Sequence, residues 1–284
     1  MSETISGKAD PYAVIGNPIG HSQSPRIHAL FAAQTGQFME YRAILAEVGE
    51  FAAAVDAFRG SGGRGLNVTV PFKQDAWVYA DVLSARAERA GAVNTLAFRE
   101  DGGAWGDNTD GVGLVRDLRG NYGFDAGGKR ILILGAGGAA RGIVQPLLGE
   151  SPTQVVIANR TPDRAAQLAL LFVDLGHIGA CSFPELQGQS FDLIINATAA
   201  GLADQTPLLP EGVLAAEGWC YDLMYGGKPT AFVRWGRAHG AARSLDGLGM
   251  LVEQAAESFR LWRGVDPDTQ AVLAALREGR AEPT

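Results

Sequence analysis

A glycine-rich segment directly after an apolar stretch is the first feature that points to chemistry. The apolar stretch 130–134 runs into Gly135-Ala136-Gly137-Gly138-Ala139-Ala140. In this spacing the first glycine permits a tight turn, the second lets the backbone approach a pyrophosphate, and the small third position lets a helix pack closely on the strand. The N-terminus of the following helix then presents N–H groups to an anion. The motif alone would equally fit an ordinary turn, but its place between a strand and a helix favours a dinucleotide site.

The next predicted strand ends at a segment that indicates which dinucleotide is bound. NAD enzymes usually carry an acidic residue there to bind the ribose 2′-hydroxyl. This chain has Asn159-Arg160-Thr161 instead, and Arg164 follows one helical turn later. The planar guanidinium of Arg160 can bind a 2′-phosphate, which an acid would repel. We therefore expect NADP, although a solvated arginine on a loop is the alternative, and nearby Asp163 is assigned to the helix dipole.

Polar side chains gather at four further places, each following or interrupting an apolar run. These clusters are residues 20–25, 67–73, 91–95 and 106–111. Ligands of α/β proteins bind at the carboxyl ends of the strands. Each cluster by itself is typical of a turn or a helix cap. The four together predict a polar ligand site.

Alternating strand and helix patterns must position these residues. Strands are expected at 12–16, 40–44, 65–70, 92–99, 130–134, 154–158, 191–196 and 219–223, and helices at 25–35, 49–60, 73–89, 139–149 and 162–175. This alternation predicts right-handed βαβ units and a parallel sheet. A domain boundary is expected near 110–113, and a long amphipathic helix begins near residue 246.

Composition narrows the class of protein. The 284 residues suggest about two domains, and the net charge of −7 argues against a nucleic-acid partner. No apolar run approaches the ~18 residues of a membrane span, and the first eight residues do not resemble a secretory signal. The two cysteines, Cys181 and Cys220, are expected to be free thiols in a reducing cytoplasm, and the four histidines form no metal motif.

Taken together, these segments resemble the shikimate dehydrogenases, a resemblance that spans nearly the whole chain. It is carried by Gly16 to Ile19 with His21 to Pro25, Leu66 to Lys73, Gly91 to Thr95, Asp107 to Gly113, Gly135 to Ala139, Asn159 to Thr161, Asn196 to Thr198, Asp222 to Tyr225, and Asp246 to Met250 with Gln254. Each piece is unspecific, but the combination is highly specific. One family cofactor contact, an acidic side chain in the helix after Lys73, is replaced by Ala85.

The resemblance implies a role for each matching residue. The catalytic pair would be Lys73 and Asp110. The substrate carboxylate would be bound by Ser22 and Ser24 with Tyr225, and the ring hydroxyls by Asn67, Thr69, Asn94, Asp110 and Gln254. The cofactor would be held by Gly135, Ala136, Gly137, Gly138, Ala139, Asn159, Arg160, Thr161 and Arg164, with Leu223 and Gly247 near the nicotinamide.

The resemblance also implies an α/β fold of two domains. Residues 1–110 would form a substrate-binding and catalytic domain with a mainly parallel sheet, completed by 247–284, whose helices return to it. Residues 111–246 would form a Rossmann-type, doubly wound NADP-binding domain. The partners would be small molecules, shikimate and 3-dehydroshikimate, in a cytoplasmic monomer or homodimer without a metal.

The residues suit such a reaction without reference to the family. Reduction of a ketone needs a hydride at carbon, which a nicotinamide supplies, and a proton at oxygen. The ammonium of Lys73 can give that proton, and Asp110 can orient it and favour its charged form. The alternative is that Lys73 is an ordinary surface lysine of a helix, which is the commoner position for this residue type. Specificity would come from hydrogen bonds to hydroxyls, because an analogue lacking one would leave a buried polar group unpaired.

Three other functions remain open from the sequence. An NAD-dependent quinate/shikimate dehydrogenase would carry an acid in place of Thr161. A catalytically silent NADP-binding regulator would lack Lys73 or Asp110, and both are present. A folate-linked dehydrogenase of similar two-domain plan would explain the cofactor half but not Ser22, Ser24 and Asn94.

Overall fold

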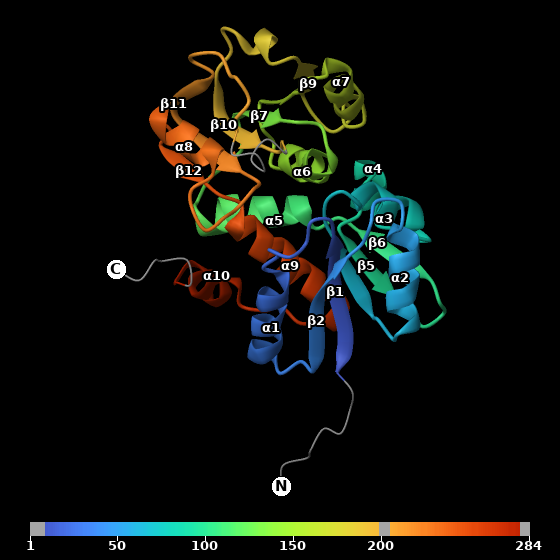
Figure 1. The fold of residues 1–284 in the computed structure, drawn as a ribbon. Helices are drawn as coiled ribbons and strands as arrows, with labels where there is room; N and C mark the ends of the chain where they lie inside the picture. Colours follow the sequence, from blue (N-terminus) through green and yellow to red (C-terminus); the bar gives the residue numbers. More distant parts are fainter. Residues whose placement is uncertain (1–8, 199–204, 279–284) are drawn as a thin grey trace. The chain divides into compact units, whose positions relative to one another are not determined.

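The computed structural model describes residues 9–198 and 205–278 (Figure 1). The predicted absence of a secretory signal concerns residues 1–8 and so lies outside this description. The chain divides into two compact units, one of Met1–Thr109 with Ala255–Val272 and one of Asp110–Gln254 with Leu273–Thr284. Compact units and functional domains need not share boundaries, so the domains 1–110 with 247–284 and 111–246 stay a prediction.

The first unit is built on a mixed sheet with the strand order β2-β1-β3-β5-β6-β4. Its strands are β1 (Asp10–Gly16), β2 (Met39–Leu45), β3 (Gly65–Val68), β4 (Val82–Leu83), β5 (Thr95–Phe98) and β6 (Ala104–Asp107), and its helices are α1 (Ser24–Thr35), α2 (Phe51–Gly60), α3 (Lys73–Tyr79) and α4 (Ala85–Ala90). The apolar residues Phe51, Val55 and Phe58 recur at helical spacing on α2 and are buried. They pack in one core with β1 and β3 residues such as Ile15 and Leu66.

The single helix predicted over 73–89 is wrong. Helix α3 ends before Ala80, whose backbone is extended, and α4 begins after Ser84, whose hydroxyl accepts the N–H of Ala87. Between them β4 pairs in parallel with β6. The alanine-rich composition favoured helix throughout, but the serine cap and strand pairing override that weak preference.

Strand β6 lies where the sequence predicted only a polar cluster. It pairs antiparallel with β5, which itself pairs antiparallel with β3. The backbone N–H of Asn94 donates to the carbonyl of Asp107 at 3.0 Å. Because both pairings are antiparallel, β6 runs in the same direction as β3, and the two strands end on the same side of the sheet.

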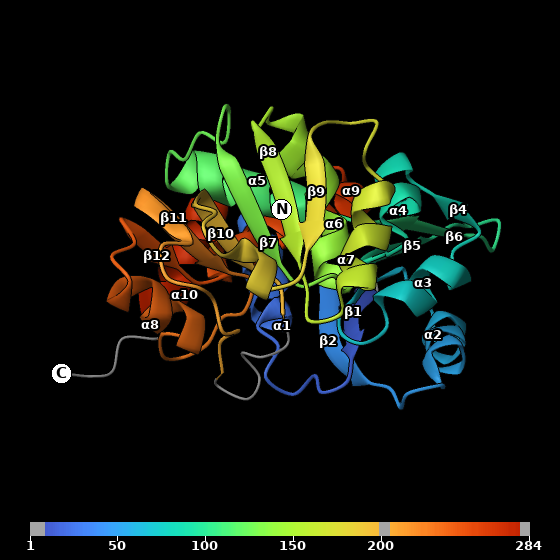
Figure 2. The same ribbon diagram turned by 90° about the horizontal axis from the view of Figure 1, so that it is seen from above.

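The second unit is a parallel sheet with the order β12-β11-β10-β7-β8-β9, whose strands lie side by side in Figure 2. Its elements are α5 (Asp110–Arg116), η1 (Asp117–Asn121), β7 (Arg130–Leu134), α6 (Gly138–Gly149), β8 (Gln154–Ala158), α7 (Pro162–Leu170), β9 (Ile178–Cys181), η2 (Pro184–Leu186), β10 (Phe191–Asn196), β11 (Leu214–Asp222), α8 (Ala231–Ala238) and β12 (Arg243–Leu245). Counted in chain order this is 3-2-1-4-5-6, the doubly wound arrangement of dinucleotide-binding sheets.

Helices cover both faces of that sheet. Residues Ile131 and Ile133 of β7 pack on one face with apolar residues of α5, α6 and α7. Residues Leu132 and Leu134 pack on the other face with Phe232 of α8. A strand buried on both sides explains the continuous apolar run that the sequence shows here. The predicted fold class is confirmed.

The C-terminal helices α9 (Leu248–Arg263) and α10 (Thr269–Glu278) complete the chain. The second half of α9 belongs to the first unit. There the indole N–H of Trp262 donates to the carbonyl of Leu96 at 3.0 Å, and Arg263 pairs with Asp10 at 2.5 Å. The predicted return of the C-terminal helices to the first domain holds for Ala255–Val272, whereas most of α10, from Leu273 onward, belongs to the second unit.

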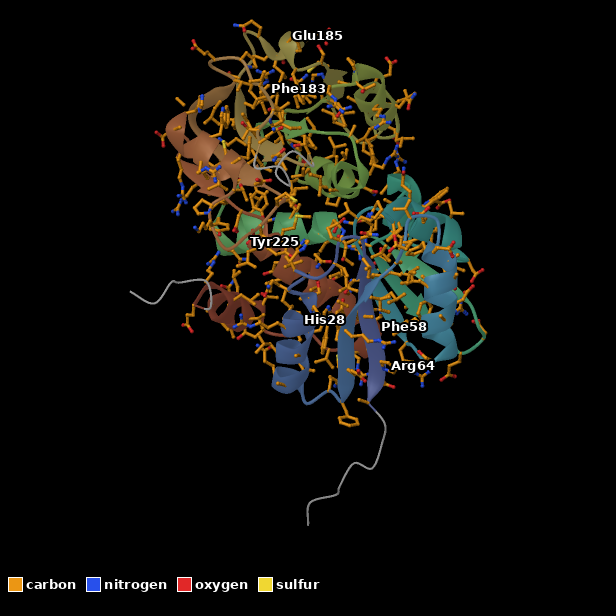
Figure 3. The ribbon with its side chains drawn as sticks, in the orientation of Figure 1. His28, Phe58, Arg64, Phe183, Glu185 and Tyr225 are labelled. Carbon is orange, nitrogen blue, oxygen red and sulfur yellow. The ribbon has the colours of Figure 1, made fainter. Side chains whose placement is uncertain are left out.

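The core beneath α1 contains an ionisable side chain, His28 (Figure 3). Its ring is fully buried and stacks on Tyr41, with ring centroids 4.1 Å apart. Neither ring nitrogen has a hydrogen-bond partner among the described residues. Burial lowers the pKa of His28 to about 3, and the nearby side chain of Asn67 opposes only a small part of this shift.

This pKa predicts an acid sensitivity of the first unit. Unfolded His28 takes up a proton near its ordinary pKa of about 6.5, whereas the folded side chain stays neutral down to about 3. The contribution of the neutral, buried ring to the free energy of unfolding is complete above pH 6.5 and is lost as the pH falls toward 3. Between pH 7 and pH 5 it should remove about 2 kcal/mol from the free energy of unfolding.

The variant His28→Phe, which keeps an aromatic ring against Tyr41, isolates this effect. Urea unfolding of both proteins at pH 7 and pH 5 measures the difference. The variant should lose about 2 kcal/mol less than the wild type between the two pH values. Equal losses would show that His28 is not the group that titrates.

Candidate functional site

The carboxyl end of β3 brings two asparagines together. The N–H of Val68 donates to the carbonyl of Asn94 at 2.8 Å, and Asn67 precedes Val68 directly. Both carboxamides are buried, with 5% of Asn67 and 2% of Asn94 exposed. Since buried amides are almost always hydrogen-bonded, their orientation is set by their neighbours.

Lys73 lies close to this pair along the backbone. It is the first residue of α3, and its carbonyl accepts the N–H of Val93 at 2.8 Å. The turn before it is closed by Phe72, whose N–H donates to the carbonyl of Thr69 at 3.0 Å. The side chain of Lys73 is half-buried. The fold therefore ties Thr69 and Lys73 to the segment that carries Asn94.

Ser22 and Ser24 lie at the start of α1. Ser24 is buried, and its N–H donates to the hydroxyl of Ser22 at 3.3 Å. The first turn of a helix presents unpaired N–H groups and a positive dipole end to an anion. Two hydroxyls at this position suit a carboxylate.

The remaining predicted substrate residues belong to the second unit. Asp110 opens α5 and follows Thr109 directly along the chain, and Gln254 lies on α9. Tyr225 follows β11 and is half-buried (Figure 3). The structure thus groups Ser22, Ser24, Asn67, Thr69, Lys73 and Asn94 in one unit, and Asp110, Tyr225 and Gln254 in the other.

Sequence reasoning missed the polar residues that hold the two asparagines. The phenol of Tyr41 donates to Asn67 Oδ1 at 2.7 Å. Burial raises the pKa of Tyr41 well above 10, so the phenol keeps the proton that it donates. The hydroxyls of Thr95, Thr109 and Ser258 lie on the other side. Tyr41 lies in a strand of alternating pattern and Ser258 in an amphipathic helix. Neither pattern indicates that the residue contacts Asn67.

In the second unit, the glycine-rich turn has the geometry that a pyrophosphate site requires. Gly135 has a φ of +104°, and a Cβ there would lie 3.0 Å from the carbonyl oxygen of Ala197. Gly137 is the N-cap of α6, and a Cβ there would meet nothing within 4 Å. The protein itself needs glycine at 135. Among the described residues, the space beside position 137 is open; Ala136 lies between the two glycines, and Gly138 and Ala139 begin α6.

The end of β8 places positive charge beside that turn in the sheet. The side-chain amide of Asn159 donates to the carbonyl of Thr161 at 2.9 Å. Arg160, Thr161 and Arg164 are exposed. No acid occupies the end of this strand, so these residues fit a 2′-phosphorylated dinucleotide.

Gly247 and Leu223 lie against each other. A Cβ on Gly247 would come within 2.4 Å of the carbonyl oxygen of Leu223, and the N–H of Gly247 donates to the carbonyl of Met224 at 3.0 Å. Asp222 anchors this loop by accepting from Asn196 at 3.0 Å. Burial raises the pKa of Asp222.

Within residues 9–198 and 205–278, the His, Cys, Asp and Glu side chains form no group of three that could hold a metal ion. The same residues contain no helix with the length and apolar character of a membrane span.

A doubly wound parallel sheet with this turn after its central strand defines the class of dinucleotide-binding proteins. Three family models match the chain: the shikimate dehydrogenase substrate binding domain at residues 14–96, shikimate / quinate 5-dehydrogenase at 120–212, and the shikimate 5′-dehydrogenase C-terminal domain at 247–277.

Known proteins agree with these matches. Shikimate dehydrogenase (NADP(+)) of Alkalilimnicola ehrlichii is 58% identical over 94% of this chain and 98% of its own. The crystal structure of an Ael1 enzyme from Pseudomonas putida is 46% identical, with a TM-score of 0.86 over 94% of this chain and 98% of its own. Shikimate 5-dehydrogenase of Thermus thermophilus, solved with NADP(H) and shikimate, is 34% identical, with a TM-score of 0.83 over 95% and 99%. The chain belongs to the shikimate dehydrogenase family.

The open space at Gly137 predicts a selective loss of cofactor binding. Gly137→Ala should fold normally, because its methyl group would meet no atom of the described residues within 4 Å, yet it should weaken NADP+ binding tenfold or more by occupying the pyrophosphate space. Fluorescence titration and thermal melting measure the two quantities.

Gly149→Ala, at the other end of α6 and equally open, is the matched control and should leave both unchanged. Wild-type NADP+ affinity in Gly137→Ala would place the pyrophosphate elsewhere.

Proposed function

We propose that this chain is an NADP-dependent shikimate dehydrogenase, an oxidoreductase that reversibly reduces 3-dehydroshikimate to shikimate on the route to the aromatic amino acids. The observation that carries this proposal is the chain-wide likeness to NADP-dependent relatives, together with Arg160 in a segment, 159–161, that lacks the acid of an NAD enzyme. Neither an NAD-dependent quinate dehydrogenase nor a silent regulator is favoured.

The roles of individual residues form part of this proposal. Ser22 and Ser24 bind the carboxylate with Tyr225, while Asn67, Thr69, Asn94, Asp110 and Gln254 bind ring hydroxyls. Bound NADP(H) supplies or accepts the hydride. Lys73 gives a proton to the ketone oxygen or takes it from the hydroxyl, and Asp110 orients it. Burial of Ser24, Asn67 and Asn94 supports a site that rejects analogues lacking a hydroxyl.

The cofactor would be held by Gly135 to Ala139 at its pyrophosphate, by Asn159, Arg160, Thr161 and Arg164 at its adenosine end, and near Leu223 and Gly247 at its nicotinamide. In domain terms, residues 1–110 with 247–284 would bind substrate and 111–246 would bind NADP. We further infer a cytoplasmic monomer or homodimer. The two cysteines, both free thiols in the structure, suit a reducing compartment.

Initial rates test the function directly. Purified protein should oxidise shikimate with NADP+ faster than quinate with NAD+. The reverse preference would move the chain to the quinate dehydrogenases, and binding of NADP+ without turnover of either substrate would favour the regulator.

Removing the amine of Lys73 should abolish the chemistry without preventing cofactor binding. For Lys73→Met we expect kcat to fall roughly 10²- to 10⁴-fold, the usual contribution of a positioned acid or base. The dissociation constant of NADP+ should stay within about twofold, since binding needs no proton transfer. Lys129→Met is the control, because Lys129 lies directly before β7 with a partly exposed side chain that pairs only loosely with Asp192, at 3.9 Å. A kcat of Lys73→Met within threefold of the wild type would contradict the assignment.

Arg160 should decide between the two cofactors. Arg160→Ala removes the predicted partner of the 2′-phosphate, so KM for NADP+ should rise about tenfold or more while KM for NAD+ changes little. Arg237→Ala, an exposed arginine of α8, should change neither constant. Equal increases of KM for NADP+ and for NAD+ would show that Arg160 does not bind the 2′-phosphate.

A further inference from the structure

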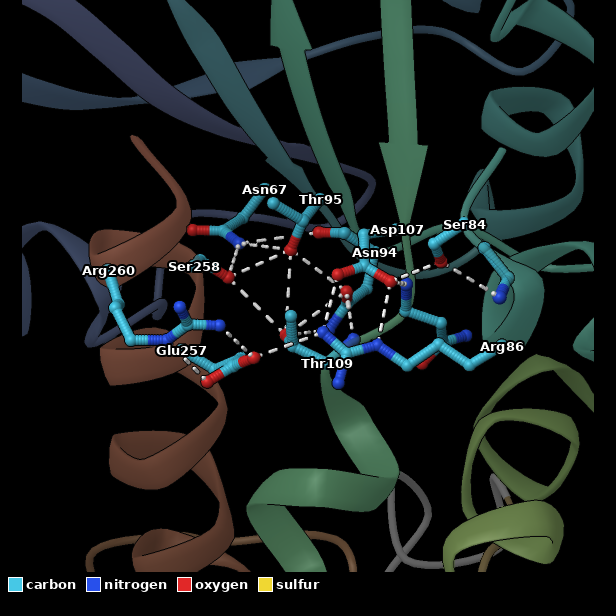
Figure 4. A network of polar contacts seen from close by, with 12 residues as sticks. Asn67, Ser84, Arg86, Asn94, Thr95, Asp107, Thr109, Glu257, Ser258 and Arg260 are labelled. Carbon is cyan, nitrogen blue, oxygen red and sulfur yellow. Dashed lines mark hydrogen bonds and ion pairs between the residues drawn. The ribbon is translucent and has the colours of Figure 1, made fainter. Parts of the chain in front are cut away.

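Three buried hydroxyls lie together in the first unit, where α9 packs on the ends of the strands (Figure 4). They belong to Thr95, Thr109 and Ser258, which are completely buried, and are called the hydroxyl cluster below. Ser258 Oγ lies 2.8 Å from Thr95 Oγ1 and 3.3 Å from Thr109 Oγ1. None of the three has a role in the chemistry proposed above.

The hydroxyl cluster joins the two asparagines of the substrate site. Asn67 Nδ2 donates to Ser258 Oγ at 2.9 Å. Thr95 Oγ1 donates to Asn94 Oδ1 at 2.9 Å. A continuous path of hydrogen bonds therefore runs from one carboxamide through two hydroxyls to the other.

Two backbone groups determine which way each carboxamide faces. The carbonyl of Asn94 can only accept, and it lies 3.3 Å from Asn67 Nδ2. The N–H of Thr109 can only donate, and it lies 2.8 Å from Asn94 Oδ1. A flipped amide would set two oxygens or two N–H groups against each other, so these contacts fix both orientations.

This orientation gives Asn67 a defined chemical character. Both N–H bonds of its carboxamide point at acceptors inside the protein: Ser258 Oγ, Thr95 Oγ1 and the carbonyl of Asn94. Its oxygen accepts a hydrogen bond from Tyr41. A carbonyl oxygen has two lone pairs, so the same oxygen could accept a second hydrogen bond, from a ligand hydroxyl.

An ion-pair network holds Ser258 in register. Its neighbour Glu257 is buried and pairs with Arg86 at 3.2 Å and with Arg260 at 2.8 Å. Arg86 also pairs with the buried carboxylate of Asp107 at 2.5 Å. Because one guanidinium joins α9 to the end of β6, the helix cannot slide along the sheet without breaking charge-assisted hydrogen bonds.

We propose that Ser258 is a positioning residue for the substrate site, holding the carboxamide of Asn67 so that its oxygen accepts a hydrogen bond from a substrate hydroxyl. The assignment rests on the proposed function. Ser258 itself does not touch the substrate. It acts through Asn67, and Thr95 links it to Asn94.

Steady-state kinetics of Ser258→Ala test this assignment. KM for shikimate should rise roughly 3- to 10-fold, the effect of losing one neutral hydrogen bond. KM for NADP+ should stay at the wild-type value. In an Asn67→Ala background, Ser258→Ala should have no further effect, because its route to the substrate is gone.

A matched pair at Thr95 keeps the test valid if Ser258→Ala folds poorly. Thr95→Val removes the hydroxyl at nearly constant volume and should raise KM for shikimate, whereas Thr95→Ser keeps the hydroxyl and should restore it. Thr35→Ala is the control, since it removes a hydroxyl of the same unit that bonds only within α1. Its kinetics should match the wild type.

The outcomes separate this assignment from the proposed function. Wild-type turnover of shikimate with an unchanged KM in Ser258→Ala, or equal KM values for Thr95→Val and Thr95→Ser, would overturn the positioning role alone. Additive effects in the Asn67→Ala background would overturn it as well. Wild-type protein that does not turn over shikimate would overturn the proposed function, and this assignment with it.

Discussion

The hydrogen bond from the N–H of Val68 to the carbonyl of Asn94 is the contact on which the polar site of the first unit depends. At 2.8 Å it joins the end of β3 to the residue before β5. It sets Asn67 beside Asn94, and the bond from Val93 to the carbonyl of Lys73 brings the start of α3 to the same place. Because these links are made by the backbone, they hold the polar residues together without a ligand, which would limit the ordering cost of binding.

Under the proposed function, the two units would recognise their ligands by different means. In the first unit, the recognising groups would be buried side chains of fixed polarity, such as Asn67 between Tyr41 and Ser258. In the second, backbone conformation would provide most of the recognition, through the left-handed Gly135 and the N-cap position of Gly137. Side-chain hydrogen bonds discriminate strongly among polyols, whereas a glycine turn accepts any pyrophosphate. The choice of cofactor would then come from side chains at the end of β8.

Much of this arrangement could be predicted from the sequence, because strong local signals and global fold agree. The apolar run of β7 with its glycine turn and the alternation of strands and helices suffice for the second unit. The helix predicted over 73–89 failed because pairing of β4 with β6 is non-local and leaves no mark in an alanine-rich stretch. Tyr41 and Ser258 were missed for a similar reason, since hydrogen bonding of Asn67 to a residue 191 positions away cannot be read from local spacing. Which predicted residues act on the substrate stays a prediction.

A crystal structure of the protein with NADP+ and shikimate would show whether Asn67 accepts a hydrogen bond from the substrate. We expect a ring hydroxyl within hydrogen-bond distance, about 2.5–3.0 Å, of Asn67 Oδ1, with the contacts of Tyr41 and Ser258 to Asn67 unchanged. Shikimate bound with its hydroxyls away from Asn67 and Asn94, or a carboxamide of Asn67 turned to present its N–H groups, would contradict it.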